Sequence, residues 1–169
     1  MMTVKISKGR RLFKFLVVAI LLALLFGGAA QMIVAGGAKS LNLGDKLLGN
    51  SDGATLQVAG QPYGAGPRNK LNIWVPTGTA KTDKLPVLVW LYGGGWYSGQ
   101  RDYYGFAGRV FAKQGFIVVI PDYRLVPDGH WPDFLQDSAA AVAWTQRHIA
   151  DYGGDPGRMA LSCRKSGQC

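Results

Sequence analysis

Two short apolar runs near the middle of the chain do not alternate with polar residues. Residues 86–92 read Pro-Val-Leu-Val-Trp-Leu-Tyr, and residues 116–120 read Phe-Ile-Val-Val-Ile. A strand that is covered on both faces has this continuous apolar pattern, which is typical of parallel sheets. We therefore predict a fully buried strand at each of these two positions.

The residues between the two runs have the spacing of one helix face. Asp102 is placed to cap the amino end of this helix, and Gly115 is placed to end it. A strand, a helix and a strand within about forty residues predict a βαβ unit, whose two strands are parallel. The apolar positions of the predicted helix face are Phe106, Ala107, Val110 and Phe111.

Three further segments complete the predicted sheet and its covering helices. Residues 71–75 alternate between apolar and polar and predict a half-exposed strand that ends at Pro76. Residues 133–152 predict a longer helix, because apolar residues share one face and two glycines follow. Residues 159–162 predict the start of a third buried strand, which we expect to form an unprotected apolar edge of the sheet.

The amino-terminal part of the chain differs from the rest. Five basic residues precede 24 residues without a charge, from Phe15 to Ala38. This pattern predicts that residues 1–38 are a signal peptide or a transmembrane helix acting as an anchor, and both the cleaved and the uncleaved form stay open. The basic end should stay in the cytoplasm, so we expect the body to be membrane-anchored or exported, on the periplasmic or extracellular side.

The remaining chain divides into two parts. Residues 39–70 are rich in Gly, Asn, Ser and Asp, and we interpret them as a linker or approach segment with one short strand near residues 55–58. Residues 71–169 carry the strand and helix patterns described above. We therefore expect residues 71–169 to form the N-terminal part of an α/β domain.

The overall charge does not indicate a nucleic-acid partner. The formal net charge is +9, but five of the nineteen basic residues lie before residue 15. The body shows no basic stripe with interleaved aromatic residues, which argues against nucleic-acid binding. Cys163 and Cys169 are too few for a disulfide framework or a four-ligand metal site, so we expect no metal. A disulfide between them stays open, although two incidental thiols fit better.

Three consecutive glycines follow the first buried strand. Gly93, Gly94 and Gly95 let backbone amides approach a ligand with no Cβ in the way. Two such amides aimed at a developing oxyanion can each stabilise a transition state by ~3 kcal/mol. A phosphate cradle is the competing interpretation, but the glycine and lysine spacing of phosphate-binding loops is missing. We therefore predict an oxyanion hole at Gly93, Gly94 and Gly95.

The ordered set of segments carries a family resemblance. A strand, Tyr-Gly-Gly-Gly-Trp, a helix, a strand, Asp-Tyr-Arg-Leu, a helix, Tyr-Gly-Gly-Asp-Pro-Gly-Arg and a strand follow each other between residues 71 and 162. This order resembles the α/β-hydrolase carboxylesterases and lipases whose oxyanion loop is His-Gly-Gly-Gly or Tyr-Gly-Gly. The resemblance implies a partial α/β-hydrolase fold, with a mostly parallel sheet and flanking helices after an N-terminal apolar helix. It also implies oxyanion amides at Gly93, Gly94 and Gly95.

The chain departs from that family after the third predicted strand. The family continues with Gly-x-Ser-x-Gly, and here that elbow falls on residues 163–167. Lys165 occupies the nucleophile position, Ser166 lies one residue beyond it, and Cys163 replaces a glycine. The catalytic acid and histidine of the family come later still. We therefore identify no catalytic residue and expect this chain to lack serine-hydrolase activity.

The remaining polar residues do not supply a triad. His130 lies in a loop and His148 on the solvated side of a helix, and we assign both to the surface. Asp137 is assigned a role in supporting the long helix. Cys163 would need a histidine base within reach to act as a nucleophile.

The resemblance implies a hydrolase of the carboxylesterase or lipase type, which in complete form hydrolyses small-molecule carboxylic esters without a cofactor. The alternative is a membrane-anchored, non-catalytic interaction module, or a remnant, that uses the same partial fold.

Overall fold

The computed structural model describes residues 37–47, 49 and 52–163 of the 169-residue chain. The chain divides into two compact units, Met1–Leu41 and Asn42–Cys169. Residues 37–47 are helical, while nearly all of the predicted signal peptide or anchor lies outside the described residues. No helix in the described ranges has the length and apolar character needed to cross a membrane.

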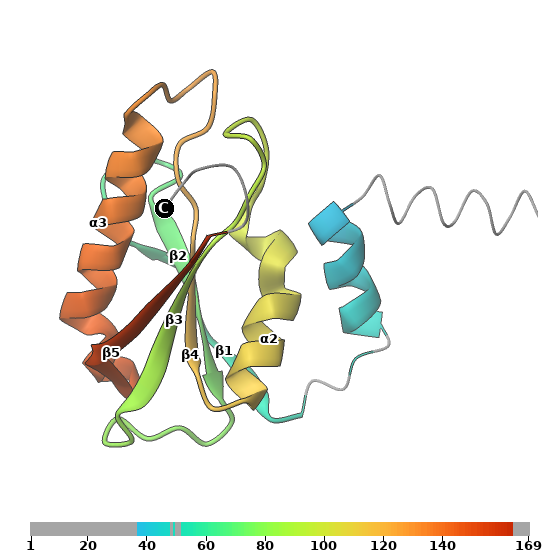
Figure 1. Ribbon diagram of the computed structural model, residues 1–169. Coiled ribbons are helices and arrows are strands. Elements are labelled where there is room, and N and C mark those ends of the chain that lie inside the picture. The colour runs from blue at the N-terminus through green and yellow to red at the C-terminus, as the bar shows by residue number, and fades with distance from the viewer. Residues whose placement is uncertain (1–36, 48, 50–51, 164–169) are drawn as a thin grey trace, which may run out of the picture. The chain divides into compact units, whose positions relative to one another are not determined.

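The second unit is built on a mixed five-stranded sheet (Figure 1). The strands lie in the order β1-β2-β4-β3-β5. β1 and β4 both pair with β2 in antiparallel fashion, whereas β3 is parallel to both β4 and β5. The strands are β1 (Ala54–Pro62), β2 (Lys70–Pro76), β3 (Leu85–Leu91), β4 (Ile117–Pro121) and β5 (Gly154–Cys163).

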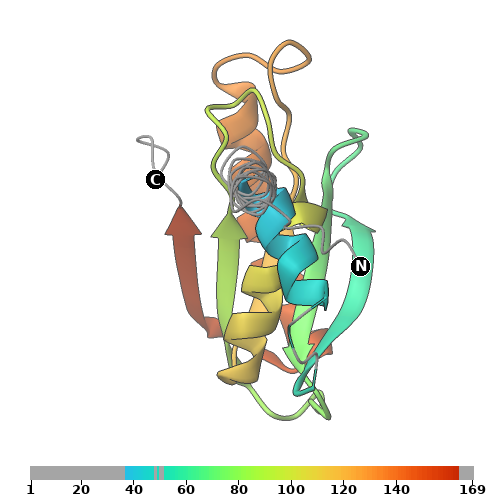
Figure 2. The ribbon, with the colours of Figure 1, turned by 90° about the vertical axis from the view of Figure 1, so that its right-hand side faces the viewer.

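Helices cover both faces of the sheet. The short 3-10 helix η1 (Arg101–Tyr104) leads into α2 (Gly105–Lys113), and α3 (Asp133–His148) continues into η2 (Ile149–Tyr152). α2 packs on one face and α3 on the opposite face, as the two perpendicular views show (Figures 1 and 2). The predicted βαβ unit is therefore confirmed, with β3 and β4 parallel and α2 between them in the chain.

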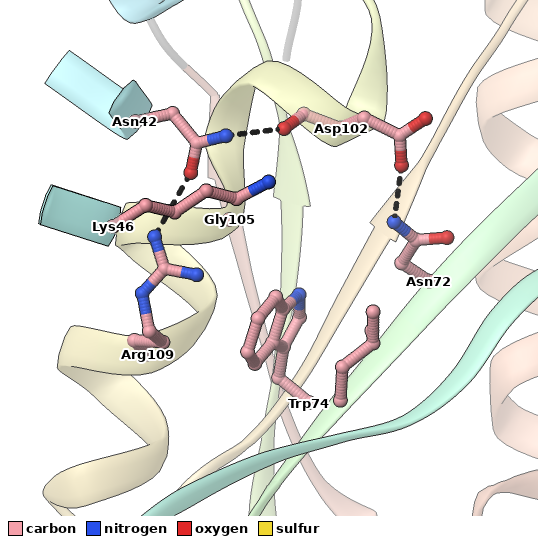
Figure 3. Close-up of a pocket in the computed structure, with 8 residues that line it drawn as sticks. Asn42, Lys46, Asn72, Trp74, Asp102, Gly105 and Arg109 are labelled. Atoms are coloured by element: carbon pink, nitrogen blue, oxygen red, sulfur yellow. Dashed lines mark hydrogen bonds between the residues drawn. The ribbon is translucent and has the colours of Figure 1, made fainter. Parts of the chain in front are cut away.

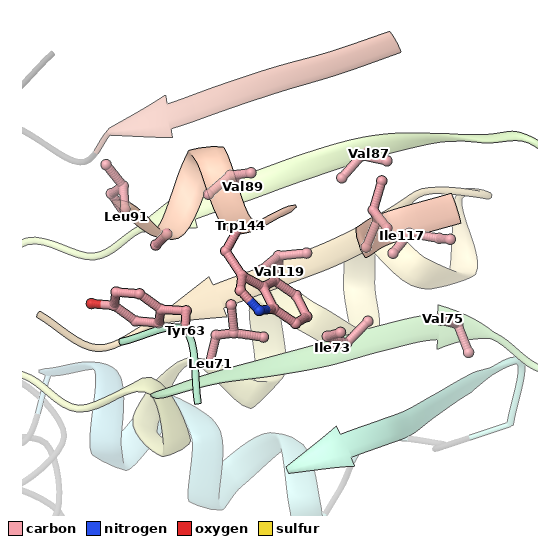
Figure 4. Close-up of a cluster of buried hydrophobic side chains, with 12 residues drawn as sticks. Tyr63, Leu71, Ile73, Val75, Val87, Val89, Leu91, Ile117, Val119 and Trp144 are labelled. Carbon is pink, nitrogen blue, oxygen red and sulfur yellow. The ribbon is translucent and has the colours of Figure 1, made fainter. Parts of the chain in front are cut away.

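The main apolar core lies between the sheet and α3 (Figure 4). Alternate residues of three adjacent strands point to this side, where Trp144 of α3 packs over them. These strand residues are at most 5% exposed, so the removal of their apolar surface from water stabilises the packing of α3 on the sheet. They are Leu71, Ile73, Val75, Val87, Val89, Leu91, Ile117 and Val119.

The structure corrects two predictions about exposure. β2 was predicted to be half-exposed, but every residue from Leu71 to Val75 is buried because α2 and α3 cover its two faces. The buried side of α2 also differs from the predicted apolar face: Val110 is 45% exposed. Gly108 faces the sheet instead, because the indole of Trp74 occupies the space there.

Both edge strands of the sheet, β1 and β5, are longer than predicted. β1 spans nine residues with two register shifts rather than four residues near Thr55. Asp102 belongs to η1 instead of capping α2, whose N-cap position is Tyr104. The strand predicted to be buried at residues 159–162 is not buried: these residues are half-buried or exposed, because β5 is the last strand of the sheet. Leu161 is 49% exposed, in agreement with the predicted apolar edge.

Candidate functional site

The glycine turn, which we define as Gly93, Gly94 and Gly95, follows β3 at the carboxyl edge of the sheet. Gly94 has φ 152° and Gly95 has φ 63°. A Cβ on Gly94 would lie 1.9 Å from the carbonyl oxygen of Ser98, so no other residue fits there without displacing the backbone. The amides of Tyr97 and Ser98 both donate to the carbonyl of Gly94 at 3.2 Å, which closes the turn.

The amides of the glycine turn are available to a ligand. Gly94 and Gly95 are exposed and Gly93 is half-buried. Within the described ranges, none of these three amides donates to a protein acceptor. A turn with free amides at the carboxyl edge of parallel strands is chemically suited to bind a negatively charged oxygen.

Three tyrosines support the glycine turn from below. Tyr92 is fully buried and stacks on Tyr104 and Tyr123, with ring centroids 5.0 and 4.7 Å away. The hydroxyl of Tyr104 donates to the carbonyl of Gly93 at 3.2 Å, and the hydroxyl of Tyr123 donates to the carbonyl of Tyr92. Two consecutive carbonyls at the entry of the turn are thus fixed by buried side chains.

Asp122, at the end of β4, is the centre of the network beneath the turn. It is 3% exposed, and its Oδ1 accepts hydrogen bonds from the Tyr92 hydroxyl at 2.6 Å and from the Arg101 amide at 2.7 Å. Its Oδ2 accepts from the guanidinium of Arg101. Burial, followed by the negative charge of Asp122, raises the pKa of Tyr92, so this hydroxyl stays protonated and donates.

Arg68 joins the glycine turn to the segment after β4. Its Nε donates to the carbonyl of Tyr123 at 2.8 Å, and a terminal nitrogen donates to the Tyr92 hydroxyl at 3.1 Å. The same nitrogen donates to the carbonyl of Gly99 at 2.8 Å and lies 3.7 Å from Asp122. Arg68 therefore links both ends of the loop that contains the glycine turn.

The residue after Tyr123 fixes this loop to α3. The Arg124 guanidinium donates to both carboxylate oxygens of Asp137, at 2.8 and 2.9 Å, and the Arg124 amide donates to the same carboxylate at 2.9 Å. Burial acts to raise the pKa of Asp137, but these hydrogen bonds outweigh it and leave the pKa lowered. The predicted supporting role of Asp137 is therefore that of an anchor for Arg124.

Aromatic side chains form one wall beside the turn. Trp96, directly after the glycines, stacks on Phe134 of α3 at 4.0 Å and meets Tyr123 edge-on at 5.4 Å. The Trp96 carbonyl accepts from the amide of Val126 at 2.8 Å. Trp131 is 73% exposed and contacts Phe134 at the outer end of this wall.

The other candidate residues do not join this site. His130 and His148 are exposed, and the His148 ring lies 4.7 Å from that of Trp144. Lys165 and Ser166 lie outside the described residues, as does the side chain of Cys163. Among the residues that the structure describes, no group of His, Cys or Asp could hold a metal ion.

Sequence reasoning did not identify Asp122, Arg101 and Arg68 as the support of the turn. The resemblance included Asp122 only as part of the Asp-Tyr-Arg-Leu segment, and its two arginine partners lie 21 and 54 positions earlier in the chain. A carboxylate that directly follows a fully apolar strand was the available signal, because such a group is buried and needs partners.

Comparison with known sequences places the chain in a defined group. The sequence model described as the carboxylesterase family matches residues 70–168. A protein of Oryza sativa named "Probable isoprenylcysteine alpha-carbonyl methylesterase" is 36% identical over 105 residues, which are 62% of this chain and 24% of that protein. Carboxylesterase NlhH of Mycobacterium tuberculosis is 41% identical over 86 residues, or 50% of this chain and 27% of that protein.

Solved structures show the same fold. Esterase B of Lactobacillus rhamnosis superposes with a TM-score of 0.69 at 23% identity, covering 88% of this chain and 47% of that chain. Esterase 2 of Thermogutta terrifontis with butyrate bound gives a TM-score of 0.57 at 25% identity, covering 70% and 42%. The chain thus spans about a quarter of the length of these curated relatives and under half of these structures.

Proposed function

The chain belongs to the carboxylesterase family, and from that premise we propose that its glycine turn is the oxyanion hole of a carboxylic ester hydrolase. In such an enzyme, a nucleophile attacks the ester carbonyl, and amides of the turn donate hydrogen bonds to the oxygen as it becomes negative. The reaction needs no cofactor. The substrate would be a small-molecule ester, as the names of the relatives also suggest.

The observation that carries this proposal is a turn whose entry carbonyls are held by buried hydroxyls, while its amides have no acceptor among the described residues. A donor stabilises a transition state best when it is already oriented before the charge develops, because no reorganisation is then needed. Buried hydroxyls hold the carbonyls of Tyr92 and Gly93, while the amides of the glycine turn donate to no acceptor within residues 37–47, 49 and 52–163. A turn that only connected β3 to η1 would not need this support.

The nucleophile would come from the chain that follows β5. β5 is parallel to β3, so its carboxyl end lies at the same edge of the sheet as the glycine turn. Leu91, two residues before the turn, pairs with Cys163. A nucleophile shortly after Cys163 would therefore be placed next to the turn. In this sequence Lys165 stands at that position, and we infer that the chain by itself does not hydrolyse esters.

An exchange of segments tests the proposed role. We would replace the matching segment of the Mycobacterium tuberculosis carboxylesterase with residues 71–162 of this chain and measure hydrolysis of p-nitrophenyl butyrate. The proposal predicts a hybrid with ester hydrolase activity, because the host supplies the nucleophile, acid and histidine. A folded hybrid with no activity above the uncatalysed rate would contradict it.

A covalent probe tests the inactivity of the chain itself. The purified 169-residue chain should remain unlabelled by a fluorophosphonate, while the segment hybrid should be labelled. Stoichiometric labelling of the chain would show that it contains an activated serine.

We propose that residues 1–38 direct the body to the periplasmic or extracellular side of the membrane, or anchor it there. Expression with a carboxyl-terminal tag, followed by carbonate extraction of the membranes and mass measurement, separates the cleaved and uncleaved forms. A full-length, carbonate-soluble cytoplasmic product would contradict both.

A second candidate function has one observation in its favour. An apolar groove of about 350 Å³ lies between α3 and β5 and is lined by Leu91, Val142 and Leu161, among others. Exposed apolar surface beside an unpaired strand edge is typical of a protein interface. A non-catalytic interaction module would bind its partner through this groove. This function would be favoured if the hybrid carboxylesterase had no activity and the body of this chain were soluble and unfolded cooperatively.

A further inference from the structure

A second pocket lies on the opposite side of the sheet from the main core, at the amino end of α2 (Figure 3). It has a volume of about 150 Å³ and lies between the end of the amino-terminal helix, β2 and the start of α2. None of the residues of the glycine turn lines it. The lining residues are Asn42, Lys46, Leu56, Asn72, Trp74, Asp102, Gly105 and Arg109.

The walls of this pocket are fixed by hydrogen bonds. Asn42 donates to the carbonyl of Asp102 at 2.7 Å and accepts from the Arg109 guanidinium at 2.9 Å. Asn72 is 2% exposed and donates to the carboxylate of Asp102 at 2.8 Å. Three elements that are distant in the sequence thus hold one preformed cavity, which is the usual condition for a small-molecule site.

Arg109 and Trp74 form the floor. Arg109 is 7% exposed, and its guanidinium carbon lies 5.1 Å from the centre of the Trp74 ring, in a cation–π arrangement. The charge of Arg109 is balanced by Asp45, which accepts from it directly. The indole nitrogen of Trp74 lies against Gly108 and has no hydrogen-bond partner among the described residues.

Lys46 gives the pocket one positive charge that is not balanced by a paired carboxylate. Its side chain lines the pocket and extends toward Gly105 (Figure 3). In the part of the chain that the structure describes, Lys46 forms no ion pair, whereas Arg109 pairs with Asp45. The carboxylate of Asp102 lies 3.9 Å from Arg101 and belongs to a balanced group of two carboxylates and two guanidiniums, completed by Asp122 and Arg68. A monoanion is therefore the charge that this pocket accepts best.

The volume of the pocket and the residues that line it limit which ligands can bind. A water molecule takes about 30 Å³ of liquid volume, so a cavity of about 150 Å³ holds roughly five atoms of that size. Leu56 and Trp74 are the large apolar residues that line the pocket, and Lys46 brings an ammonium group to it. A short hydrocarbon tail with one charged end matches both features.

We propose that this pocket binds a short-chain monocarboxylate of about three carbons, with the carboxylate at Lys46 and the hydrocarbon tail between Leu56 and Trp74. The site is separate from the glycine turn and does not depend on the proposed ester hydrolysis. Its ligand is recognised by charge at one end and by apolar contact at the other.

Titration of the full 169-residue chain in neutral detergent micelles with sodium propionate tests this assignment. The probe signal is the indole N–H resonance of Trp74 in a nitrogen–proton correlation spectrum, assigned by its loss in Trp74→Phe. We expect this resonance to move saturably, at constant ionic strength. Propionamide has the same shape without the charge, and it should bind at least fivefold more weakly.

Matched variants separate the pocket from non-specific anion binding. Lys46→Gln keeps the length of the side chain but removes its charge, and it should weaken propionate binding about fivefold, the usual scale for one exposed charge. Leu56→Trp should abolish binding by filling the cavity from its exposed wall. Lys81→Gln, at an exposed position that does not line the pocket, should bind like the unchanged chain.

Three results would overturn the proposal. The first is a Trp74 resonance that does not respond to propionate at concentrations up to tens of millimolar. The second is equal binding of propionate and propionamide. The third is unchanged binding in Lys46→Gln and Leu56→Trp, each confirmed as folded by its spectrum.

Discussion

Replacement of Asp122 by asparagine should destabilise the loop that carries the glycine turn. Asp122 is 3% exposed, and its carboxylate accepts three hydrogen bonds, from the Tyr92 hydroxyl and from the amide and guanidinium of Arg101. Asparagine keeps the shape and one acceptor oxygen but removes the charge and turns one contact into a clash of two donors. Arg101 then loses its closest carboxylate and, among the described residues, keeps only Asp102, at 3.9 Å.

The magnitude follows from the burial of this pair. Breaking a buried ion pair by removing one partner costs about 3–5 kcal/mol. The Arg101 side chain is 17% exposed, so water relieves part of that cost. We therefore expect a loss of about 2–4 kcal/mol in the free energy of unfolding, while Asp128→Asn, at an exposed position, should change it by less than ~0.5 kcal/mol.

Equilibrium urea unfolding, followed by tryptophan fluorescence, measures these differences. Tyr92→Phe removes the hydroxyl that donates to Asp122 and should cost about 1.5–3 kcal/mol, as expected for a hydrogen bond to a charged group. The two changes share one contact, so the double variant should lose clearly less than the sum of the single losses. Additive losses, or an Asp122→Asn chain as stable as Asp128→Asn, would refute the network as the support of the turn.

Three other predictions address separate parts of the fold. The pKa of Asp137 is lowered in the folded state, so its ionised form stabilises the fold above the pKa of the unfolded chain. The difference in unfolding free energy between the unchanged chain and Asp137→Asn, measured by urea titration, should therefore be constant from about pH 5 to 7. It should shrink below about pH 4, where the carboxylate becomes protonated. Gly108→Ala should lower the free energy of unfolding in urea by about 1–3 kcal/mol, because its Cβ would lie 2.4 Å from the Trp74 ring. An unchanged free energy would show that α2 can shift away. Leu161→Lys should reduce aggregation measured by light scattering, since it places a charge on the open edge strand.

The sequence was most informative where one physical requirement determined the pattern. Continuous apolar runs marked β3 and β4 because both faces of these strands are covered. The positive φ of Gly115, just after the C-cap residue of α2, follows from the need to end a helix. These signals are local, so they could be recognised without knowledge of the fold.

The misread positions depend on distant partners. The polar residue that made β2 look half-exposed is Asn72, which is buried because Asp102 and Arg101 provide its hydrogen bonds. The face that α2 buries was misread because Trp74, about thirty residues earlier, needs glycines opposite its ring. Neither partnership has a fixed spacing in the sequence, which is why periodicity could not reveal it.

The functional site also combines a local signal, which the sequence reveals, with distant partners, which it does not. The glycine turn could be recognised from three adjacent residues, but its support comes from Arg68, Tyr92 and Asp122, which the fold brings together. The pocket beside Trp74 has no sequence signature, because its walls come from three separate elements.

The most direct test of the central claim compares two glycine substitutions in the hybrid carboxylesterase described above. Gly94→Ala should lower kcat for p-nitrophenyl butyrate about 100-fold or more, because the added Cβ displaces the turn and its donors. Gly78→Ala, at another glycine with positive φ but open space around it, should leave kcat nearly unchanged. Equal kcat values for the two folded variants would contradict the assignment of the glycine turn as an oxyanion hole.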